Sequence, residues 1–278
     1  QFTANTMAEK INIFWFRRDL RADDNAGLYH ALKSGNPVLP IFIFDKHILN
    51  KLQDKSDRRV AFIHAALETL QQTMVHAGSS LIIYHDTPEN AFKNLVSKYD
   101  ISAVFTNHDY EPYAAERDAG IKKFLDVHGI IMQTFKDQVI FEKDEILKDD
   151  GKPYTVFTPY SRKWKATLSE TQLDSYSCKK YHSNFFKHRE SKIPSLKQLG
   201  FLESAVPFPP NDLPEELIKK YGKERDFPGI KGTSRLGVHL RFGTISIRQL
   251  AAKTKLLSET YLNELIWRDF YHMILWQF

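Results

Sequence analysis

Four side chains near the end of the sequence have types and a spacing that could form a binding site. Glu264, Trp267, Arg268 and Tyr271 follow one another at i, i+3, i+4 and i+7, and a helix with this spacing carries them on one face. The face presents a carboxylate, an indole, a guanidinium and a phenol. The apolar residues that would bury the helix lie elsewhere on it: Leu262, Leu265, Ile266, Met273 and Ile274. The four polar and aromatic groups are therefore free to line a pocket.

The same four residues also fit a purely structural role. Trp267 would then pack in the core, and Glu264 would form a solvated i,i+4 ion pair with Arg268. For an isolated helix this structural interpretation is the more common outcome, so motifs elsewhere must decide between the two.

The composition is that of an ordinary globular chain. Its 278 residues are many for a single hydrophobic core, so two domains are expected. The formal net charge of +5, from 39 basic and 34 acidic residues, permits a polyanionic partner without requiring one. No run is apolar enough to cross a bilayer, and the start lacks the hydrophobic centre of a signal peptide. Gln1 to Thr6, ahead of Met7, resemble a ragged start and are left out of the fold prediction.

Cysteine and histidine usage excludes some kinds of site. A single cysteine, Cys178, cannot form an internal disulfide or a cysteine-rich metal site, and it indicates a reducing compartment. The 11 histidines show no HExxH or comparable ligand spacing, so no metal is expected. Together these features favour a cytoplasmic protein without a membrane partner.

Strand and helix patterns alternate through the first half of the chain. Short β-branched and aromatic runs predict strands at 11–16, 38–45, 81–84, 104–105 and 130–134. Helical periods and capping residues predict helices ending near 33 and spanning 57–77, 88–99 and 112–128. This alternation predicts an α/β fold with a doubly wound, Rossmann-like parallel sheet. Neither GxGxxG nor a phosphate-loop motif occurs, which counts against an ordinary nucleotide-binding module.

The sequence changes character after Phe141. A turn precedes a helix predicted to begin near Pro159, and the segment from 168 to 210 is polar and irregular. Helical periods dominate from Pro214 onward, and the last one meets no stop signal before Phe278. We therefore predict three parts: an α/β domain at 7–141, a linker with short helices at 142–210, and the first part of an incomplete all-helical domain at 211–278.

Seven motifs match one known pattern in one order. They are 15–21 with Asp24 and Asn25, 110–113 with Arg117 and Asp118, 151–160, Tyr221 with 225–228, 232–236, 239–243 and 263–271. Each motif alone is weak, but the ordered set is specific. The chain thereby resembles the DNA photolyase and cryptochrome family over essentially its whole length, and cyclobutane pyrimidine dimer photolyases in particular. The resemblance implies an α/β antenna domain, a connector and a helical FAD-binding domain.

The resemblance also implies which residues wrap the FAD phosphates. Thr233, Ser234, Arg235 and Leu236 keep the family motif, whose last serine is Gly237 here. A backbone contact to phosphate would survive that change, whereas a hydroxyl contact would not. The alternative role for Thr233 and Ser234 is an ordinary helix N-cap.

Three further residues match family positions beside the cofactor. They are Tyr221, Tyr261 and Arg268. The structural alternatives are core packing for the two tyrosines and an ion pair of Arg268 with Glu264 or Asp269.

A DNA-binding face is implied by the same resemblance, made of Arg225, Glu264, Trp267, Arg268 and Tyr271. Arg225 matches a DNA-facing arginine, a role suited to a guanidinium, although a surface ion pair with Asp226 or Glu224 is the alternative. Glu264 and Trp267 match the catalytic residues that meet a flipped lesion. The indole offers a flat packing surface, and the carboxylate can accept a base N–H or, when protonated, donate to a carbonyl.

The activity implied is that of a deoxyribodipyrimidine photo-lyase, a base-flipping enzyme of damaged double- or single-stranded DNA. Excited reduced FAD would pass an electron to the dimer, and the redox chemistry would belong to the cofactor. The alternative is a cryptochrome-type blue-light photoreceptor without repair activity, which the pair Glu264 and Trp267 disfavours. The full-length protein is expected to be a monomer.

A second, light-harvesting chromophore is also implied for the α/β domain. Folate-binding family members carry an Asn-Glu pair shortly after the Tyr-Glu motif, where this chain has Tyr113 and Ala114. The carboxylate that would hold a folate pterin is thus missing. A deazaflavin or another flavin is favoured over folate, and the identity stays open.

Overall fold

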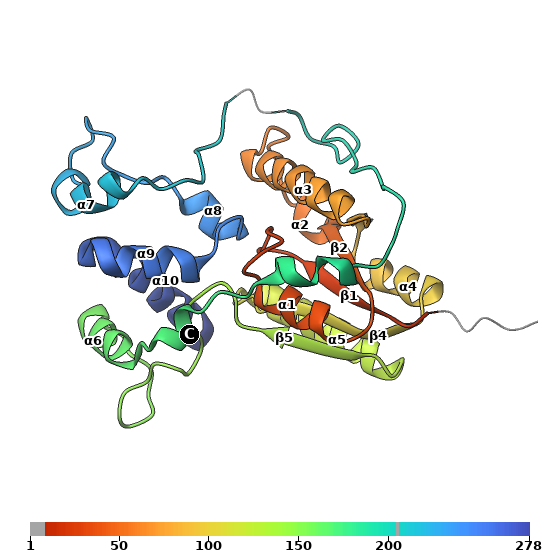
Figure 1. The fold of residues 1–278 in the computed structure, drawn as a ribbon, viewed down its shortest axis with the longest axis horizontal. Coiled ribbons are helices and arrows are strands. Elements are labelled where there is room, and N and C mark those ends of the chain that lie inside the picture. The colour runs from red at the N-terminus through yellow and green to blue at the C-terminus, as the bar shows by residue number, and fades with distance from the viewer. Residues whose placement is uncertain (1–8, 204–205) are drawn as a thin grey trace, which may run out of the picture.

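The computed structural model describes residues 9–203 and 206–278, so the prediction for Gln1 to Thr6 lies outside the described residues. Within these ranges the first half of the chain forms a five-stranded parallel sheet of order β3-β2-β1-β4-β5. Its strands are β1 (Ile11–Phe16), β2 (Val38–Asp45), β3 (Ile82–Asp86), β4 (Ile101–Asn107) and β5 (Ile131–Phe135). The predicted α/β class is confirmed (Figure 1).

Helices cover both faces of the sheet because alternate residues of each strand point to opposite sides. Phe14 and Phe16 of β1 face a core shared with α1 (Ala26–Lys33) and α3 (Arg58–His76). Ile13 and Trp15 face the opposite core, which α4 (Pro88–Lys98) and α5 (Pro112–Val127) complete. The short helix α2 (Lys46–Leu49) follows β2 directly.

Local capping explains where these helices start. The Asn25 side chain accepts a hydrogen bond from Leu28 N at the start of α1, and the Asp57 side chain caps α3 through Arg59 N. Side-chain oxygens at these positions satisfy N–H groups that have no partner inside the helix. The predicted helices therefore agree with the structure to within one or two residues.

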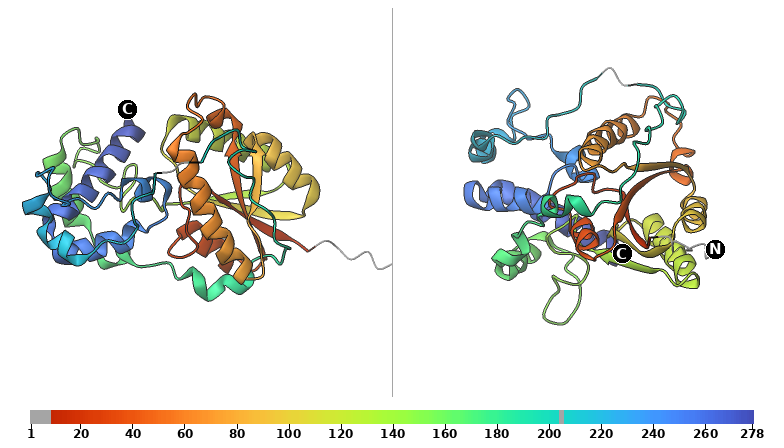
Figure 2. Two further views of the ribbon diagram at one scale, coloured as in Figure 1. Left: turned by 90° about the horizontal axis from the view of Figure 1, so that it is seen from above. Right: turned by 45° about the vertical axis from the view of Figure 1, so that its right-hand side comes forward.

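The α-helices of the second half of the chain lie to one side of the sheet (Figures 1 and 2). Its helices are α6 (Phe157–Thr167), α7 (Glu215–Glu224), α8 (Gly237–Phe242), α9 (Ile247–Leu257) and α10 (Glu259–Gln277). The start of α6 lies two residues before the predicted Pro159, because a proline in the first helical turn removes no intrahelical hydrogen bond. Among the described residues, no helix is long and apolar enough to span a membrane.

The polar segment between α6 and α7 packs against the sheet half. It contains two short 3₁₀ helices, η1 (Glu170–Leu173) and η2 (Cys178–Asn184). Phe185 is buried, and the next residue, Phe186, donates its backbone N–H to the Val38 carbonyl at 2.8 Å. The buried Cys178 thiol donates to the Asn25 carbonyl at 3.3 Å, and burial raises its pKa to about 12. Cys178 therefore has a structural role.

Buried charges join the sheet half to the helical half. Asp137 accepts hydrogen bonds from Arg21 at 2.8 Å and from Arg248 of α9 at 2.8 Å. Arg248 also donates through Nε to Asp24 at 2.9 Å. Burial by itself would raise the pKa of Asp137, but the two guanidinium groups outweigh it and hold that pKa below its usual value. Asp24, whose φ is +46°, is fixed in this conformation by its contacts in the network.

Candidate functional site

The predicted helix at the end of the chain is confirmed as α10, which begins after Ser258, whose hydroxyl accepts from Tyr261 N. Four of the expected apolar residues are buried: Leu262, Leu265, Ile266 and Met273. Glu264, Trp267 and Arg268 are half-buried, and Tyr271 is exposed. Their partners come from different segments: Arg225 for Glu264, Phe157 for Trp267, and the Gln138 and Leu240 carbonyls for Arg268.

Glu264 is paired with Arg225, which is the C-cap residue of α7. The alternative i,i+4 pair between Glu264 and Arg268 is therefore wrong, because α7 brings a guanidinium to the carboxylate from another helix. Arg225 also lies 3.5 Å from Asp226, and its guanidinium carbon lies 5.6 Å from the centre of the Tyr221 ring. The predicted DNA-facing arginine and the predicted lesion-facing carboxylate are thus direct neighbours.

The two predicted flavin-side tyrosines continue this group. The rings of Tyr221 and Tyr261 lie 4.8 Å apart, and the Tyr261 hydroxyl donates to Ser234 Oγ at 2.7 Å. Ser234, Tyr261, Tyr221, Arg225 and Glu264 therefore form one continuous row, which we call the α7–α10 row. Its members come from α7, from the loop before α8 and from α10.

The loop before α8 leaves the start of that helix open. Gly232 is required there, because a Cβ atom would lie 2.7 Å from the Glu224 carbonyl oxygen. The N-cap residue of α8 is Leu236 and no side chain caps the helix, so the N-cap alternative for Thr233 and Ser234 is wrong. A Cβ atom at Gly237 would meet no atom within 4 Å, so the space beside this residue is open.

Arg268 bonds to backbone rather than to an acid. Its guanidinium donates to the Gln138 carbonyl and, at 3.2 Å, to the Leu240 carbonyl of α8. Burial lowers the pKa of Arg268. The alternative ion pair with Glu264 or Asp269 is wrong, since Arg268 joins α10 to α8 and to the segment after β5.

Trp267 lies in a stack of three aromatic rings. The Phe157 ring of α6 is parallel to it, with ring centres 3.6 Å apart and an angle of 5°. On the helix itself, the Tyr271 ring lies 5.5 Å away at 23°. Tyr271 is 60% exposed and is the most exposed ring of the stack, since Phe157 and Trp267 are half-buried.

Asp269 is a buried carboxylate that the sequence prediction considered only as a partner of Arg268. Its Oδ2 accepts from Ile140 N and Phe141 N at 3.1 Å and from the Trp164 indole at 2.9 Å. Oδ1 is buried without a hydrogen-bond partner among the described residues. Burial raises the pKa of Asp269 to about 6. No local signal reveals these contacts, because the partners lie more than a hundred residues earlier.

The raised pKa of Asp269 predicts a pH-dependent contribution to stability. Its folded pKa of about 6 lies above the usual aspartate pKa of 3.8, so protonation favours the folded state. The stability that protonated Asp269 contributes to the fold is fully present below about pH 4 and is lost as the pH rises through 6. Relative to an Asp269→Asn variant, wild-type unfolding free energy should fall by about 2–3 kcal/mol between pH 4 and 7.

Urea denaturation of both proteins at matched pH values measures this difference. The comparison also cancels His272, whose pKa burial lowers to about 4 and which acts in the opposite direction in both proteins. A difference between the two proteins that does not change with pH would contradict the prediction.

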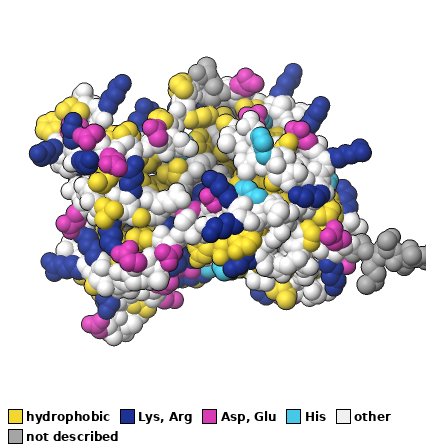
Figure 3. Space-filling model, viewed as in Figure 1, with side chains coloured by type: hydrophobic (Ala, Val, Ile, Leu, Met, Phe, Trp, Pro, Cys, Tyr) yellow, Lys and Arg dark blue, Asp and Glu magenta, His cyan; other side chains and the backbone are white. Residues whose placement is uncertain are grey.

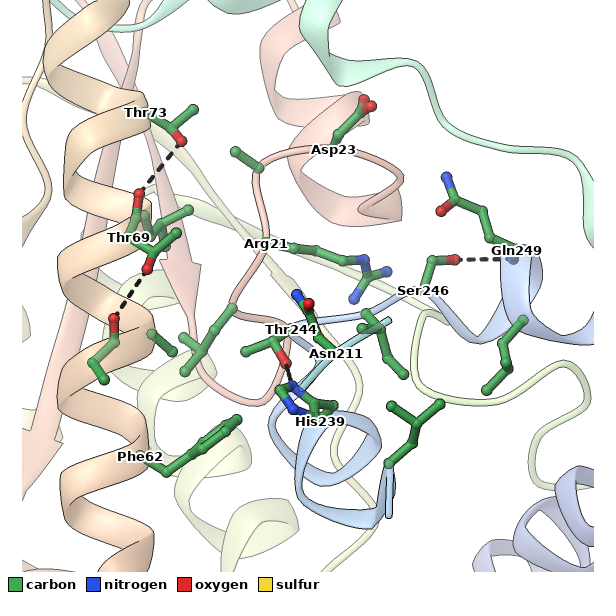
Figure 4. Close-up of a pocket in the computed structure, with 18 of the residues that line it drawn as sticks. Arg21, Asp23, Phe62, Thr69, Thr73, Asn211, His239, Thr244, Ser246 and Gln249 are labelled. Atoms are coloured by element: carbon green, nitrogen blue, oxygen red, sulfur yellow. Dashed lines mark hydrogen bonds between the residues drawn. The ribbon is translucent and has the colours of Figure 1, made fainter. Parts of the chain in front are cut away.

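A cavity of about 750 Å³ lies between α3, the loop after β1 and helices α8 and α9. Figure 3 shows a recess with hydrophobic side chains between the two halves, and in Figure 4 Arg21, Asn211 and Gln249 surround this cavity. Of the predicted site residues in the described ranges, Leu236 alone lines it. The cavity is therefore separate from the α7–α10 row.

A second cavity, of about 170 Å³, lies at the C-terminal edge of the sheet. Trp15 and Tyr113 contribute to its lining, with Arg117 4.9 Å from the Trp15 ring centre. The Tyr113 hydroxyl donates to Asp45 at 2.5 Å. Parallel α/β sheets bind ligands at this edge. Within the described part of the chain, no cluster of three or more His, Cys, Asp or Glu residues could hold a metal ion.

Comparison with known proteins connects these features to one family. Residues 12–177 match the sequence model of the DNA photolyase family. Proteins named deoxyribodipyrimidine photo-lyase from Synechococcus sp. and Halobacterium salinarum are each 32% identical over 96% of this chain. The chain spans 60% and 61% of the length of these two relatives.

Solved structures with a similar fold come from the same group of proteins. A class III photolyase from Agrobacterium tumefaciens superposes with a TM-score of 0.81 at 23% identity, over all of this chain and 61% of that one. A photolyase from Sulfolobus tokodaii, solved with two FAD molecules, gives 0.71 at 25% identity, over 95% and 59%. A cryptochrome from Synechocystis gives 0.74 at 15% identity, over 98% and 62%. The family match covers more than half of the chain, and the chain belongs to the DNA photolyase family.

Proposed function

We propose that the protein, at its full natural length, repairs cyclobutane pyrimidine dimers in DNA by light-driven electron transfer from reduced FAD. The observation that supports this proposal most strongly is the α7–α10 row. It places residues that resemble flavin-binding positions, Ser234, Tyr261 and Tyr221, next to residues that resemble DNA-binding positions, Arg225 and Glu264. An electron donor and its target must lie close together, and this arrangement would bring their two proposed binding sites into contact.

The residues before α8 fit a diphosphate group. The helix begins uncapped, Gly237 leaves open space, and Thr233 and Arg235 are exposed beside it. Backbone N–H groups at such a position favour negative charge. When bound, reduced and excited by light, FAD would supply the electron that opens the cyclobutane ring. Ser234 and Tyr261 would hold the cofactor, and Arg268, already bonded to two carbonyls, would fix α10 against α8.

The lesion would be received at the exposed side of α10. Trp267 is supported from behind by Phe157, which fixes the indole plane. A dimer that has left the duplex could pack against this aromatic stack, and Glu264 could hydrogen-bond to a base edge. A dimerised step stacks poorly in DNA, which lowers the cost of extrusion and favours damaged over intact sequence.

Replacing Trp267 by alanine should weaken binding to dimer-containing DNA about 10- to 100-fold, because the aromatic stack against which a base would pack loses its middle ring. Binding to undamaged DNA should change less than about twofold. The control is Trp276→Ala, on the same helix and 42% exposed, which should not affect either duplex. Fluorescence anisotropy with matched duplexes measures both affinities. Equal losses on the two duplexes would show that Trp267 only packs the helix.

The cavity at the C-terminal edge of the sheet supports a second chromophore. We assign it to a flavin-type antenna, since Trp15, Tyr113 and Arg117 offer an aromatic and cationic lining. The Sulfolobus tokodaii photolyase, solved with two FAD molecules, is consistent with this assignment.

A cryptochrome-type photoreceptor is the alternative function, because the fold is shared with the Synechocystis cryptochrome. A full-length preparation that stays colourless after incubation with FAD would contradict both functions.

A further inference from the structure

The ion pair between Arg225 and Glu264 joins two side chains to which the proposed function gives separate roles. The Arg225 guanidinium would bind a DNA phosphate, and the Glu264 carboxylate would contact the lesion, yet in this structure they bind each other. Both are only partly covered, with 34% and 39% of their side-chain surfaces exposed. Ion pairs of this kind contribute little to stability, so a competing partner can separate them.

The surroundings of Arg225 allow such an exchange. The Tyr221 ring lies 5.6 Å below the guanidinium carbon and holds the group at the end of α7. Asp226, the other acid nearby, lies 3.5 Å away and is 80% exposed. A phosphate offers oxygens that suit the same guanidinium donors as a carboxylate does. Arg225 can therefore change partners without a rearrangement of the helix that carries it.

We propose that Arg225 exchanges Glu264 for a DNA phosphate, and that this exchange contributes to damage specificity. The inference rests on the proposed function. On undamaged DNA, Glu264 loses its cation and gains no new contact, so the exchange opposes binding. On damaged DNA the released Glu264 carboxylate contacts the extruded bases, and this contact compensates for the lost ion pair. Glu264 thus weakens binding to intact DNA and strengthens binding to the lesion.

A double-mutant cycle on the full-length protein tests the exchange. Dissociation constants are measured in the dark for undamaged and dimer-containing duplexes with wild type, Glu264→Gln, Arg225→Gln and the double variant. Glu264→Gln should tighten undamaged binding about 3- to 10-fold, because Arg225 is then free for phosphate. In the Arg225→Gln background the same change should have less than a twofold effect. Discrimination between the two duplexes should fall in Glu264→Gln.

The matched control is Glu259→Gln on the same helix. Glu259 is paired with Lys165 at 2.6 Å and is 76% exposed, so its substitution removes an equal charge away from Arg225. It should change undamaged binding less than twofold.

Two results would overturn the proposal. One is that Glu264→Gln changes the affinity for undamaged DNA equally in the wild-type and Arg225→Gln backgrounds. The other is that Glu259→Gln tightens undamaged binding as much as Glu264→Gln does. Failure of the proposed function would look different, because wild type would then show no preference for dimer-containing DNA while the cycle on undamaged DNA could still be read.

Discussion

Replacing Asp137 by alanine is expected to lower the free energy of unfolding by about 3–5 kcal/mol. The carboxylate is fully buried and binds the guanidinium groups of Arg21 and Arg248 as well as the backbone N–H of Ala26. Its removal leaves two buried cations without their shared counter-ion and one N–H group without an acceptor. The loss should be large because the contacts join the sheet half to the helical half.

Urea denaturation followed by circular dichroism measures this effect. The control is Asp149→Ala, because the Asp149 side chain is 98% exposed and pairs with Lys163 on the surface at 3.2 Å. That variant should change the unfolding free energy by less than about 0.5 kcal/mol. Similar values for the two variants would contradict the role assigned to the buried network.

Gly243→Ala is the second substitution with a large expected effect, about 2–5 kcal/mol. The residue ends α8 with φ of +66°, and an alanine in the left-handed region is strained by about 1–2 kcal/mol. Its Cβ atom would also lie 2.2 Å from the Arg18 carbonyl oxygen and 2.5 Å from Asp19 Cα. Backbone atoms cannot turn away as a side chain can, so α8 would have to move off the sheet half.

The matched control for this glycine is Gly120→Ala in α5. A Cβ atom there meets no atom within 4 Å, and φ is not positive. Alanine is the better helix former, so this variant should be more stable than wild type by up to about 1 kcal/mol. Thermal denaturation of both variants measures the two changes in stability. A Gly243→Ala protein as stable as wild type would show that α8 is not held closely against Arg18.

The α/β half could be predicted because its signals are local. Strands such as Ile11–Phe16 are apolar throughout, since both faces of a parallel sheet are covered, and Asn25 and Asp57 cap the helices that follow. The sequence could not predict the exact start of α6, because Pro159 is compatible with more than one position in a first turn. The network around Asp137 had no local signal, since its partners come from two segments, at residues 21–26 and at Arg248, that lie more than a hundred residues away in the sequence.

The candidate site could be predicted only in part. The spacing of Glu264, Trp267, Arg268 and Tyr271 correctly predicted a shared helix face. It could not predict their partners, because Arg225, Phe157 and Gln138 are brought there by the packing of other segments. Neither composition nor spacing predicts a flavin, and FAD is implied by the family resemblance alone.

The most direct test of the proposed function is light-dependent dimer loss. The full-length protein with reduced FAD is mixed with DNA that contains a single cyclobutane dimer and is illuminated with blue light. We predict that the dimer disappears in the light and persists in the dark, and that Trp267→Ala slows its loss. If the protein carries reduced FAD and binds the DNA but the dimer persists under illumination, the repair function is wrong.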